Sequence, residues 1–181
     1  MGILSKSELK SYRNKTRYFS KSVNESLSEF KSESKYGKVT IFLSHKHDEK
    51  EELDSAISFL KQFGVEVYVD WLDEGMPKQT SGITAKRIKE KIKENQKFIF
   101  LATEGAISSK WCNWELGFGD AQKYINHIAI LPVSNDYNSF SGAEYFQIYP
   151  YIKQSDYIHS DDCYIIYPDG TEKNLKTWLR T

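Results

Sequence analysis

The sequence predicts an α/β fold, a five-stranded parallel sheet with helices on both faces, preceded by an N-terminal amphipathic helix. From residue 38 onward, short runs of β-branched and aromatic residues alternate with segments of helical periodicity. The connections between them are short, and such alternation requires parallel strands joined by right-handed crossovers. At 181 residues the chain is long enough for one domain of ordinary size with an appendage.

Residues 1–37 differ from the rest of the chain in composition. They are rich in Ser and Lys and carry eight Lys or Arg against four Asp or Glu, a net charge of +4. Apolar side chains recur every three, four or seven residues, as on one face of a helix, at Tyr12, Phe19, Val23, Leu27 and Phe30. A solvated, charged arm remains the alternative. We therefore predict two units, a helical extension over 1–37 and a domain over 38–181.

The domain is expected to alternate strands with helices. Buried strands are expected at residues 39–43, 65–69, 98–101, 127–133 and 163–167. Helices are expected through Leu53, Ile57 and Leu60 up to Gly64, through Ile83, Ile88 and Ile92, after Ser108-Ser109, and over 173–179. The pattern is weak from 134 to 160, where only a short helix near 143–147 is expected.

Polar residues gather where the expected strands end. Ser44 to Asp48 follow the first strand, a loop over 70–82 with three turn residues follows the second, and a Trp-rich helix begins after the third. In parallel sheets ligands bind outside the carboxyl ends of the strands. We therefore expect these groups to meet at one rim of the sheet.

Glu115 is the residue in this set with the most unusual surroundings. On a helix, Trp111, Glu115 and Phe118 fall at positions i, i+4 and i+7, with Trp114 on the adjoining edge. A carboxyl group among aromatic rings is partly desolvated, which raises its pKa and holds an anion where a developing cation needs one. The alternative is that Glu115 pairs with a lysine at the rim of the helix.

Three motifs follow one another with compatible spacing. They are the first strand with Ser44-His45-Lys46-His47-Asp48, the passage Val67-Tyr68-Val69-Asp70-Trp71 through Pro77, and Ser108-Ser109-Lys110-Trp111-Cys112-Asn113-Trp114-Glu115-Leu116. Together they resemble the TIR domain family in its stand-alone bacterial form, over roughly residues 38–180. The resemblance implies a flavodoxin-like sheet and, in catalytic members, cleavage of the nicotinamide–ribose bond of NAD.

The same resemblance implies roles for individual residues. It makes Glu115 the catalytic glutamate and assigns the loop over 70–82 to assembly with other TIR domains. The substrate-binding positions that it implies, with Trp71 added from the second motif, are Ser44, His45, Lys46, Asp48, Trp71, Trp111 and Trp114.

The expected chemistry needs no metal and no cofactor beyond NAD+ as substrate. Departure of nicotinamide leaves an oxocarbenium-like ribose, which a fixed carboxylate stabilises, and indole rings stack on a cationic ring. The products would be nicotinamide with ADP-ribose or a cyclic ADP-ribose isomer. In similar bacterial proteins a cyclic product signals to an effector in anti-phage defence of the Thoeris type. Self-association through TIR–TIR contacts is also expected.

Two other functions stay open: a non-catalytic TIR adaptor acting by assembly, and a nucleoside or nucleotide hydrolase of similar topology. A metal site is not predicted, because His45 and His47 have no Cys or third His nearby, and Asp48 is expected to cap the following helix.

Composition sets the remaining expectations. Balanced charge, 25 basic against 25 acidic residues, argues against nucleic-acid and membrane partners. Two cysteines without a pairing motif, and no signal peptide or apolar run long enough to span a bilayer, indicate a cytoplasmic protein.

Overall fold

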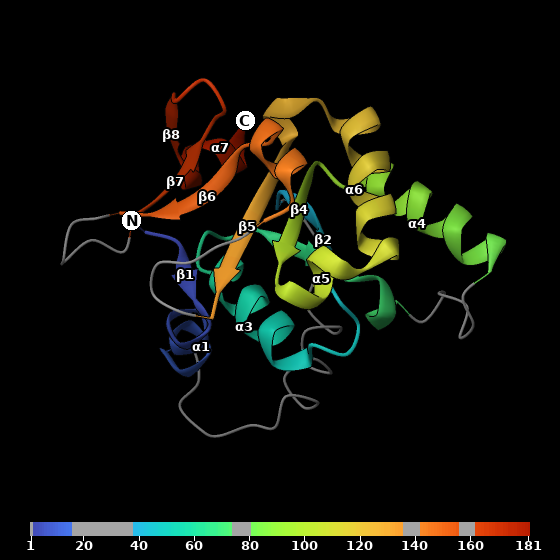
Figure 1. The fold of residues 1–181 in the computed structure, drawn as a ribbon, viewed down its shortest axis with the longest axis horizontal. Coiled ribbons are helices and arrows are strands. Elements are labelled where there is room, and N and C mark those ends of the chain that lie inside the picture. Colours follow the sequence, from blue (N-terminus) through green and yellow to red (C-terminus); the bar gives the residue numbers. More distant parts are fainter. Residues whose placement is uncertain (1, 16–37, 74–80, 136–141, 156–161) are drawn as a thin grey trace.

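The computed structural model describes residues 2–15, 38–73, 81–135, 142–155 and 162–181 (Figure 1). The strands are β1 (Leu4–Ser5), β2 (Thr40–Ser44), β3 (Glu66–Tyr68), β4 (Lys97–Ala102), β5 (Ile128–Ser134), β6 (Tyr151–Gln154), β7 (Cys163–Ile166) and β8 (Glu172–Asn174). The helices are α1 (Lys6–Lys15), α3 (Lys50–Lys61), α4 (Gly82–Glu94), α5 (Glu104–Ser108), α6 (Lys110–Lys123) and α7 (Leu175–Arg180). Short 3-10 helices are η1 (Asp70–Leu72), η2 (Ile125–His127) and η3 (Glu144–Ile148).

The strands form one sheet in the order β3-β2-β4-β5-β6-β7-β8, and β1 pairs with β5. The five strands β3, β2, β4, β5 and β6 are parallel to one another, which confirms the predicted α/β fold with a five-stranded parallel core. The prediction for the fifth strand was wrong: residues 163–166 form β7, which pairs antiparallel with β6. The true fifth strand, β6, buries only Ile152 completely, and its sequence lacks a continuous apolar run.

Helices cover both faces of the sheet (Figure 1). On one face, α1, α3 and α7 bury their apolar side chains against β2, β3 and β5, and Trp178 of α7 is fully enclosed. On the other face, α4, α5, α6 and η3 pack on the phenylalanine side chains of β2 and β4. Both sides of the central strands are therefore apolar, as expected for a doubly covered parallel sheet.

The N-terminal segment is part of this core. Gln154 N of β6 donates to Gly2 O at 2.7 Å, and Leu4 lies opposite Val133 in the ladder of β1 with β5. In α1, Leu9 is buried and the Tyr12 ring meets Phe59 of α3 edge to face, with centroids 5.1 Å apart.

An amphipathic helix is thus confirmed, but only over Lys6–Lys15. It begins ahead of the predicted apolar stripe, and β1 was not predicted. The stripe from Phe19 to Phe30 lies outside the described residues, so the boundary between 1–37 and 38–181 stays a prediction.

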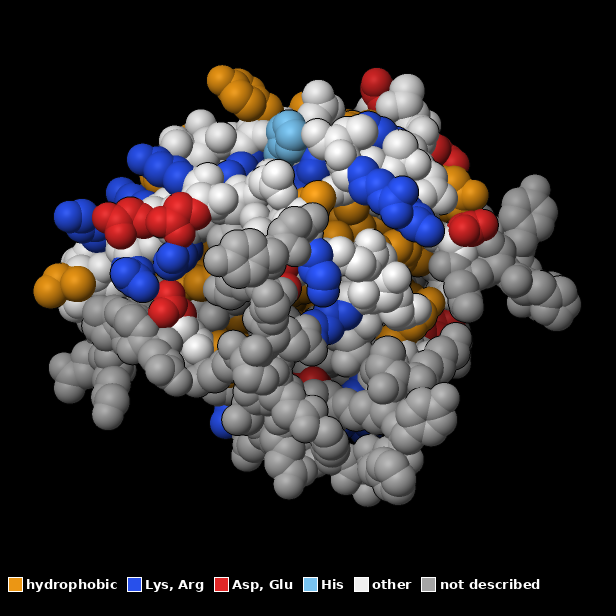
Figure 2. All heavy atoms as spheres, turned by 180° about the vertical axis from the view of Figure 1, so that it is seen from behind, with side chains coloured by type: hydrophobic (Ala, Val, Ile, Leu, Met, Phe, Trp, Pro, Cys, Tyr) orange, Lys and Arg blue, Asp and Glu red, His pale blue; other side chains and the backbone are white. Residues whose placement is uncertain are grey.

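The described surface is mixed in charge. On the face shown in Figure 2, Lys and Arg side chains are interspersed with Asp and Glu. This agrees with the formal net charge of zero. Within the described ranges, no helix has the length and apolar character needed to cross a bilayer.

Replacing Leu9 with Ala tests whether α1 contributes to the fold. The change leaves a cavity under a side chain that is 1% exposed, so the free energy of unfolding should fall by about 2–5 kcal/mol. The matched control is Lys10→Ala, an exposed neighbour whose loss should cost less than about 0.5 kcal/mol. Urea denaturation of both variants measures this, and equal effects would show that α1 is not anchored as described.

Candidate active site

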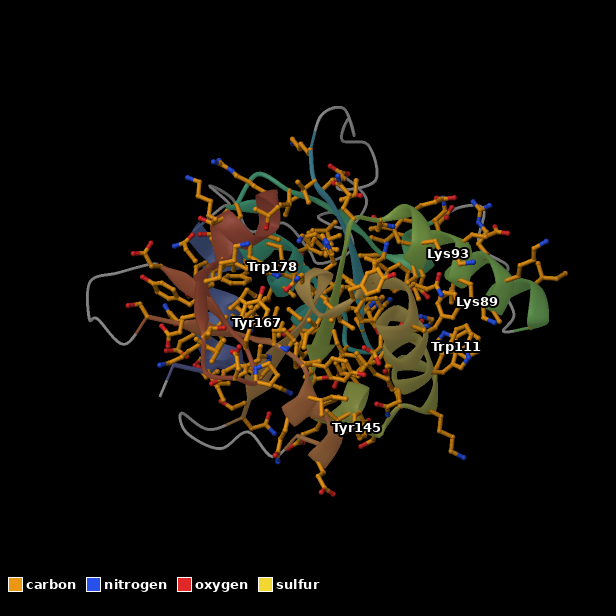
Figure 3. All side chains as sticks on the ribbon, turned by 90° about the horizontal axis from the view of Figure 1, so that it is seen from above. Lys89, Lys93, Trp111, Tyr145, Tyr167 and Trp178 are labelled. Atoms are coloured by element: carbon orange, nitrogen blue, oxygen red, sulfur yellow. The ribbon has the colours of Figure 1, made fainter. Side chains whose placement is uncertain are left out.

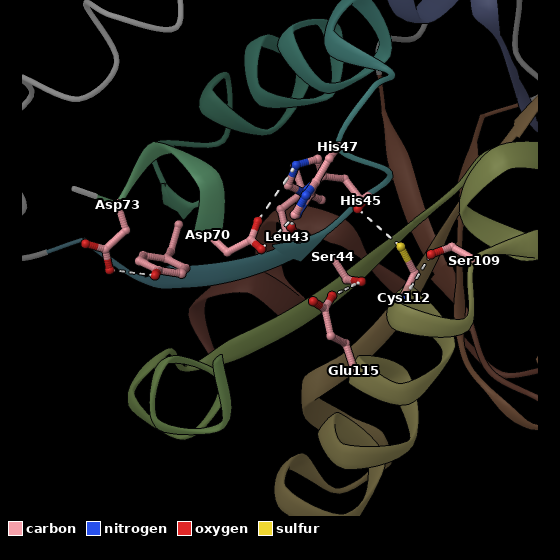
Figure 4. Close-up of polar contacts among 10 residues, drawn as sticks. Leu43, Ser44, His45, His47, Asp70, Asp73, Ser109, Cys112 and Glu115 are labelled. Atoms are coloured by element: carbon pink, nitrogen blue, oxygen red, sulfur yellow. Dashed lines mark hydrogen bonds and ion pairs between the residues drawn. The ribbon is translucent and has the colours of Figure 1, made fainter. Parts of the chain in front are cut away.

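Four segments meet at the carboxyl ends of the parallel strands. Ser44 is the last residue of β2, and His45 to His47 follow it directly. Asp70 begins η1, two residues after the end of β3, and α6 crosses the same rim after β4 and α5 (Figure 4). The predicted convergence of these segments at one edge is therefore confirmed for the residues that the structure describes.

Two features of α6 bring Glu115 to this rim. Ser109 caps the helix, because its side chain accepts from Cys112 N at 3.3 Å, and the helix begins at Lys110 as the Ser-Ser signal predicted. One turn after Glu115, Gly119 faces β4, where an added Cβ would lie 2.9 Å from the Phe98 ring. The helix axis therefore runs close to the sheet, and Glu115, on the same face, points inward.

Glu115 is 2% exposed, although its side chain is a carboxylate. Ser44 Oγ donates to Glu115 Oε2 at 2.6 Å (Figure 4), and the indole of Trp111 also favours the ionised carboxyl group. Burial raises the pKa of Glu115 well above its ordinary value and the negative charge of Asp70 raises it further, whereas Ser44 and Trp111 oppose the shift. The expected desolvated carboxyl is therefore present, and within the described ranges Glu115 forms no salt bridge with a lysine.

Asp70 joins both histidines of the first loop. His47 Nε2 lies 2.9 Å from Asp70 Oδ2, and this hydrogen bond raises the pKa of His47. His45 Nδ1 donates to Leu43 O at 3.1 Å, and burial lowers the pKa of His45. Cys112 donates from Sγ to His45 O at 3.2 Å, and burial raises the pKa of that thiol to about 11, so it stays a thiol.

A cavity of about 180 Å³ opens beside these residues. Its lining consists of His45, Lys46, His47, Thr84, Ser109, Trp111 and Cys112. A larger cavity of about 580 Å³ lies between η3, β6 and β7, but the described residues that line it include no carboxylate and no histidine. We place the site at the smaller cavity, because Trp111 both lines it and contacts Glu115.

The aromatic residues of α6 form a ladder along the helix surface. The rings of Trp111 and Trp114 are 5.0 Å apart, and Trp114 stacks on Phe118 at 6.3 Å. The Lys89 ammonium of α4 lies 5.7 Å from the Trp114 ring centroid. Figure 3 labels Lys89 on α4 and Trp111 on the neighbouring helix α6. Trp111 is thus part of the cavity wall, whereas Trp114 lies outside the cavity lining and packs against Lys89 of α4.

The other residues predicted to bind substrate also fall into two groups, those that lie at the site and those that do not. Ser44, His45 and Lys46 lie at the site. Asp48 instead forms an exposed ion pair with Lys46 at 3.6 Å, and its predicted capping of α3 was wrong, because Glu49 occupies the N-cap position. Trp71 falls within η1, and the placement of its side chain stays a prediction.

His47 and Asp70 belong to the site but were not predicted from the sequence. Their pairing joins two loops 23 residues apart, and no local pattern encodes such a contact. The one available signal was the position of Asp70 just after a strand, at the ligand-binding edge.

The buried carboxyl predicts how stability depends on pH. Because the folded protein keeps the Glu115 proton to higher pH than the unfolded chain, the free energy of unfolding falls as pH rises from about 4.3 to the folded pKa. Glu115→Gln removes this loss and should stabilise the protein at pH 7–8. The free energy of unfolding of Glu115→Gln should exceed that of the parent by about 1.4 kcal/mol for each pH unit above the unfolded pKa of Glu115, up to its folded pKa.

Chemical denaturation of Glu115→Gln and the parent between pH 4 and 8 measures this effect, with Glu90→Gln, an exposed glutamate of α4, as the control. The gain should vanish near pH 4. A destabilised Glu115→Gln protein at pH 8 would contradict the assigned environment.

Comparison with known proteins agrees with this geometry. A probable 3' cyclic ADP-D-ribose synthase, ThsB' of Bacillus cereus (strain MSX-D12), is 29% identical over 150 residues, which cover 77% of this chain and 75% of that protein. The sequence profile of the TIR domain matches residues 41–162, more than half of the chain and the span that contains β2 to β6 and Glu115. The chain therefore belongs to the TIR domain family.

Proposed function

We propose that this protein cleaves NAD+ between nicotinamide and ribose, with Glu115 as the catalytic residue. The observation that carries the proposal is the buried Glu115 carboxyl, held by Ser44 at the ligand-binding edge of the sheet, one helical turn from Trp111. Membership of the TIR domain family and similarity to a probable cyclic ADP-ribose synthase support it. An adaptor that acted only through its surface would gain nothing from a desolvated carboxyl group.

The charge of the site favours a cationic ligand. Glu115 and Asp70 lie close enough for the negative charge of Asp70 to raise the pKa of the Glu115 carboxyl group. An incoming positive charge relieves that repulsion, and the nicotinamide ring of NAD+ is a cation attached to the ribose. During cleavage the positive charge moves to the ribose, so a carboxylate fixed beside it stabilises the transition state more than water would.

The proposed step requires few groups. The bond between ribose C1′ and the nicotinamide nitrogen breaks, its electron pair leaves with neutral nicotinamide, and the ribose becomes an oxocarbenium-like cation. Ionised Glu115 stabilises this cation, while Ser44 keeps the carboxylate oriented. An oxygen nucleophile then bonds to C1′ and releases its proton: water gives ADP-ribose, and a hydroxyl of the same molecule gives a cyclic isomer.

We propose the cyclic outcome, a cyclic ADP-ribose isomer that serves as a signal in bacterial anti-phage immunity. The activity for which the relative is named, 3' cyclic ADP-D-ribose synthesis, supports it. The dry surroundings of Glu115 point the same way, because a site that excludes water gives an internal hydroxyl the advantage over hydrolysis.

The cavity beside Glu115 must also become larger before it can hold NAD+. A cavity of about 180 Å³ is smaller than the roughly 300–1,000 Å³ of typical ligand pockets. Glu115 is almost fully covered, so substrate reaches it only if Trp111 or a neighbouring segment moves. We propose that association with a second TIR domain opens and completes the pocket.

Glu115→Gln should lower kcat/KM for NAD+ by at least about 100-fold, because a neutral amide cannot stabilise the developing cation. Glu90→Gln, on the exposed face of α4, should leave it unchanged. The measurement is NAD+ loss with chromatographic separation of nicotinamide, ADP-ribose and cyclic products. NAD+ loss by Glu115→Gln at the parent rate would exclude this residue as the catalytic group.

Specific activity should rise with protein concentration, because association completes the pocket. The test combines NAD+ turnover per chain with molar mass by light scattering, over concentrations that span the self-association equilibrium. Constant specific activity in a protein that is monomeric throughout would contradict the proposed role of assembly.

A further inference from the structure

His45, His47 and Asp70 bring three potential metal ligands together. One ligand atom from each lies within 4.8 Å of the others. The two histidines come from the loop after β2, and the aspartate comes from η1 after β3 (Figure 4). In the sequence the two histidines have no third ligand nearby, whereas the fold brings a carboxylate beside them.

His45 is oriented as a metal ligand is. Its Nδ1 contacts Leu43 O, and because a carbonyl oxygen only accepts, Nδ1 carries the proton. In the neutral ring the lone pair is then on Nε2. That nitrogen is buried, has no hydrogen-bond partner among the described residues, and faces Asp70 Oδ1 at 3.9 Å. Metal-bound histidines are commonly held this way, with the far nitrogen fixed by a backbone carbonyl.

The remaining distances suit a small cation. In a tetrahedral site with bonds of 2.0–2.1 Å, ligand atoms lie about 3.3 Å apart. His47 Nε2 lies 2.9 Å from Asp70 Oδ2, His45 Nε2 lies 3.9 Å from Asp70 Oδ1, and the three ligand atoms lie within 4.8 Å of one another. A bound ion would therefore draw the most widely separated ligand atoms together by up to about 1.5 Å, and rotation of the half-exposed His47 side chain allows this. The His47 side chain is 55% exposed, which gives an ion a route from solvent.

We propose that His45, His47 and Asp70 bind one divalent transition-metal ion, of which Zn²⁺ is the best match. Two imidazole nitrogens and one carboxylate oxygen suit Zn²⁺, whereas Mg²⁺ and Ca²⁺ prefer oxygen ligands. Three protein ligands leave one coordination position for water or another ligand. The ion would lie at the wall of the cavity that His45 and His47 line, next to Trp111. This site does not depend on NAD+ cleavage, and cleavage by Glu115 does not require the ion.

The experiment measures metal uptake by the full chain without any assay of activity. Protein stripped with chelator is dialysed against limiting Zn²⁺ and analysed for metal content, and Co²⁺ is titrated as a probe whose visible absorption reports four-coordinate geometry. His47→Ala is the test variant, because its half-exposed side chain can be removed without opening the core. His127→Ala, which changes a histidine at the end of η2 and outside the trio, is the matched control. Circular dichroism shows whether each variant is folded.

We expect one Zn²⁺ per parent chain, retained in His127→Ala and bound at least about tenfold more weakly by His47→Ala. Co²⁺ absorption should follow the same order. No uptake by the parent, or equal uptake by His47→Ala, would overturn the proposal and leave the His47–Asp70 contact as an ordinary ion pair. Loss of uptake in His127→Ala would place the metal elsewhere and would overturn it as well.

Discussion

The hydrogen bond from Ser44 to Glu115 is the contact on which the candidate site depends. It joins the end of β2 to the second turn of α6 and holds a carboxyl group where solvent is excluded. Burial of a charge is costly unless other groups compensate for it, and here the hydrogen bond from Ser44 and the nearby Trp111 oppose both the desolvation and the charge of Asp70. The balance leaves Glu115 ready to interact with a positive charge that the protein itself does not supply.

The close packing of α6 on the sheet makes this arrangement possible. Gly119 allows the helix to approach Phe98, and the Ser109 cap fixes where the helix begins. A methyl group at Gly119 would push α6 away from the sheet. Because Gly119 and Glu115 lie on the same face of α6, this shift would also draw Glu115 away from Ser44. The site thus follows from packing in the core as much as from the polar residues at the rim.

The sequence was most informative where one local signal determined the outcome. The Ser-Ser pair predicted the start of α6, and the helical spacing of Trp111 and Glu115 predicted that they share a face; both are confirmed. It was least informative for β6, which has a single fully buried apolar side chain, and for β1, which is two residues long. Those strands form because β5 offers them an open edge, and no periodicity within their own sequences indicates this.

The contact between His47 and Asp70 could not be predicted because it joins residues far apart in the sequence. Asp70 was recognisable as an acidic residue after a strand, but its contact with His47 requires β2 and β3 to be neighbours in register.

The most direct test of the account is the pKa of Glu115 in the free protein. Carbon-13 NMR of the labelled side-chain carboxyl groups, assigned by comparison with Glu115→Gln, follows its titration. We predict a pKa well above the ordinary range for glutamate, raised further in Ser44→Ala, because that change removes a hydrogen bond that favours the ionised form. A Glu115 that titrates like an exposed glutamate, unaffected by Ser44→Ala, would contradict the buried and coupled environment from which the function is argued.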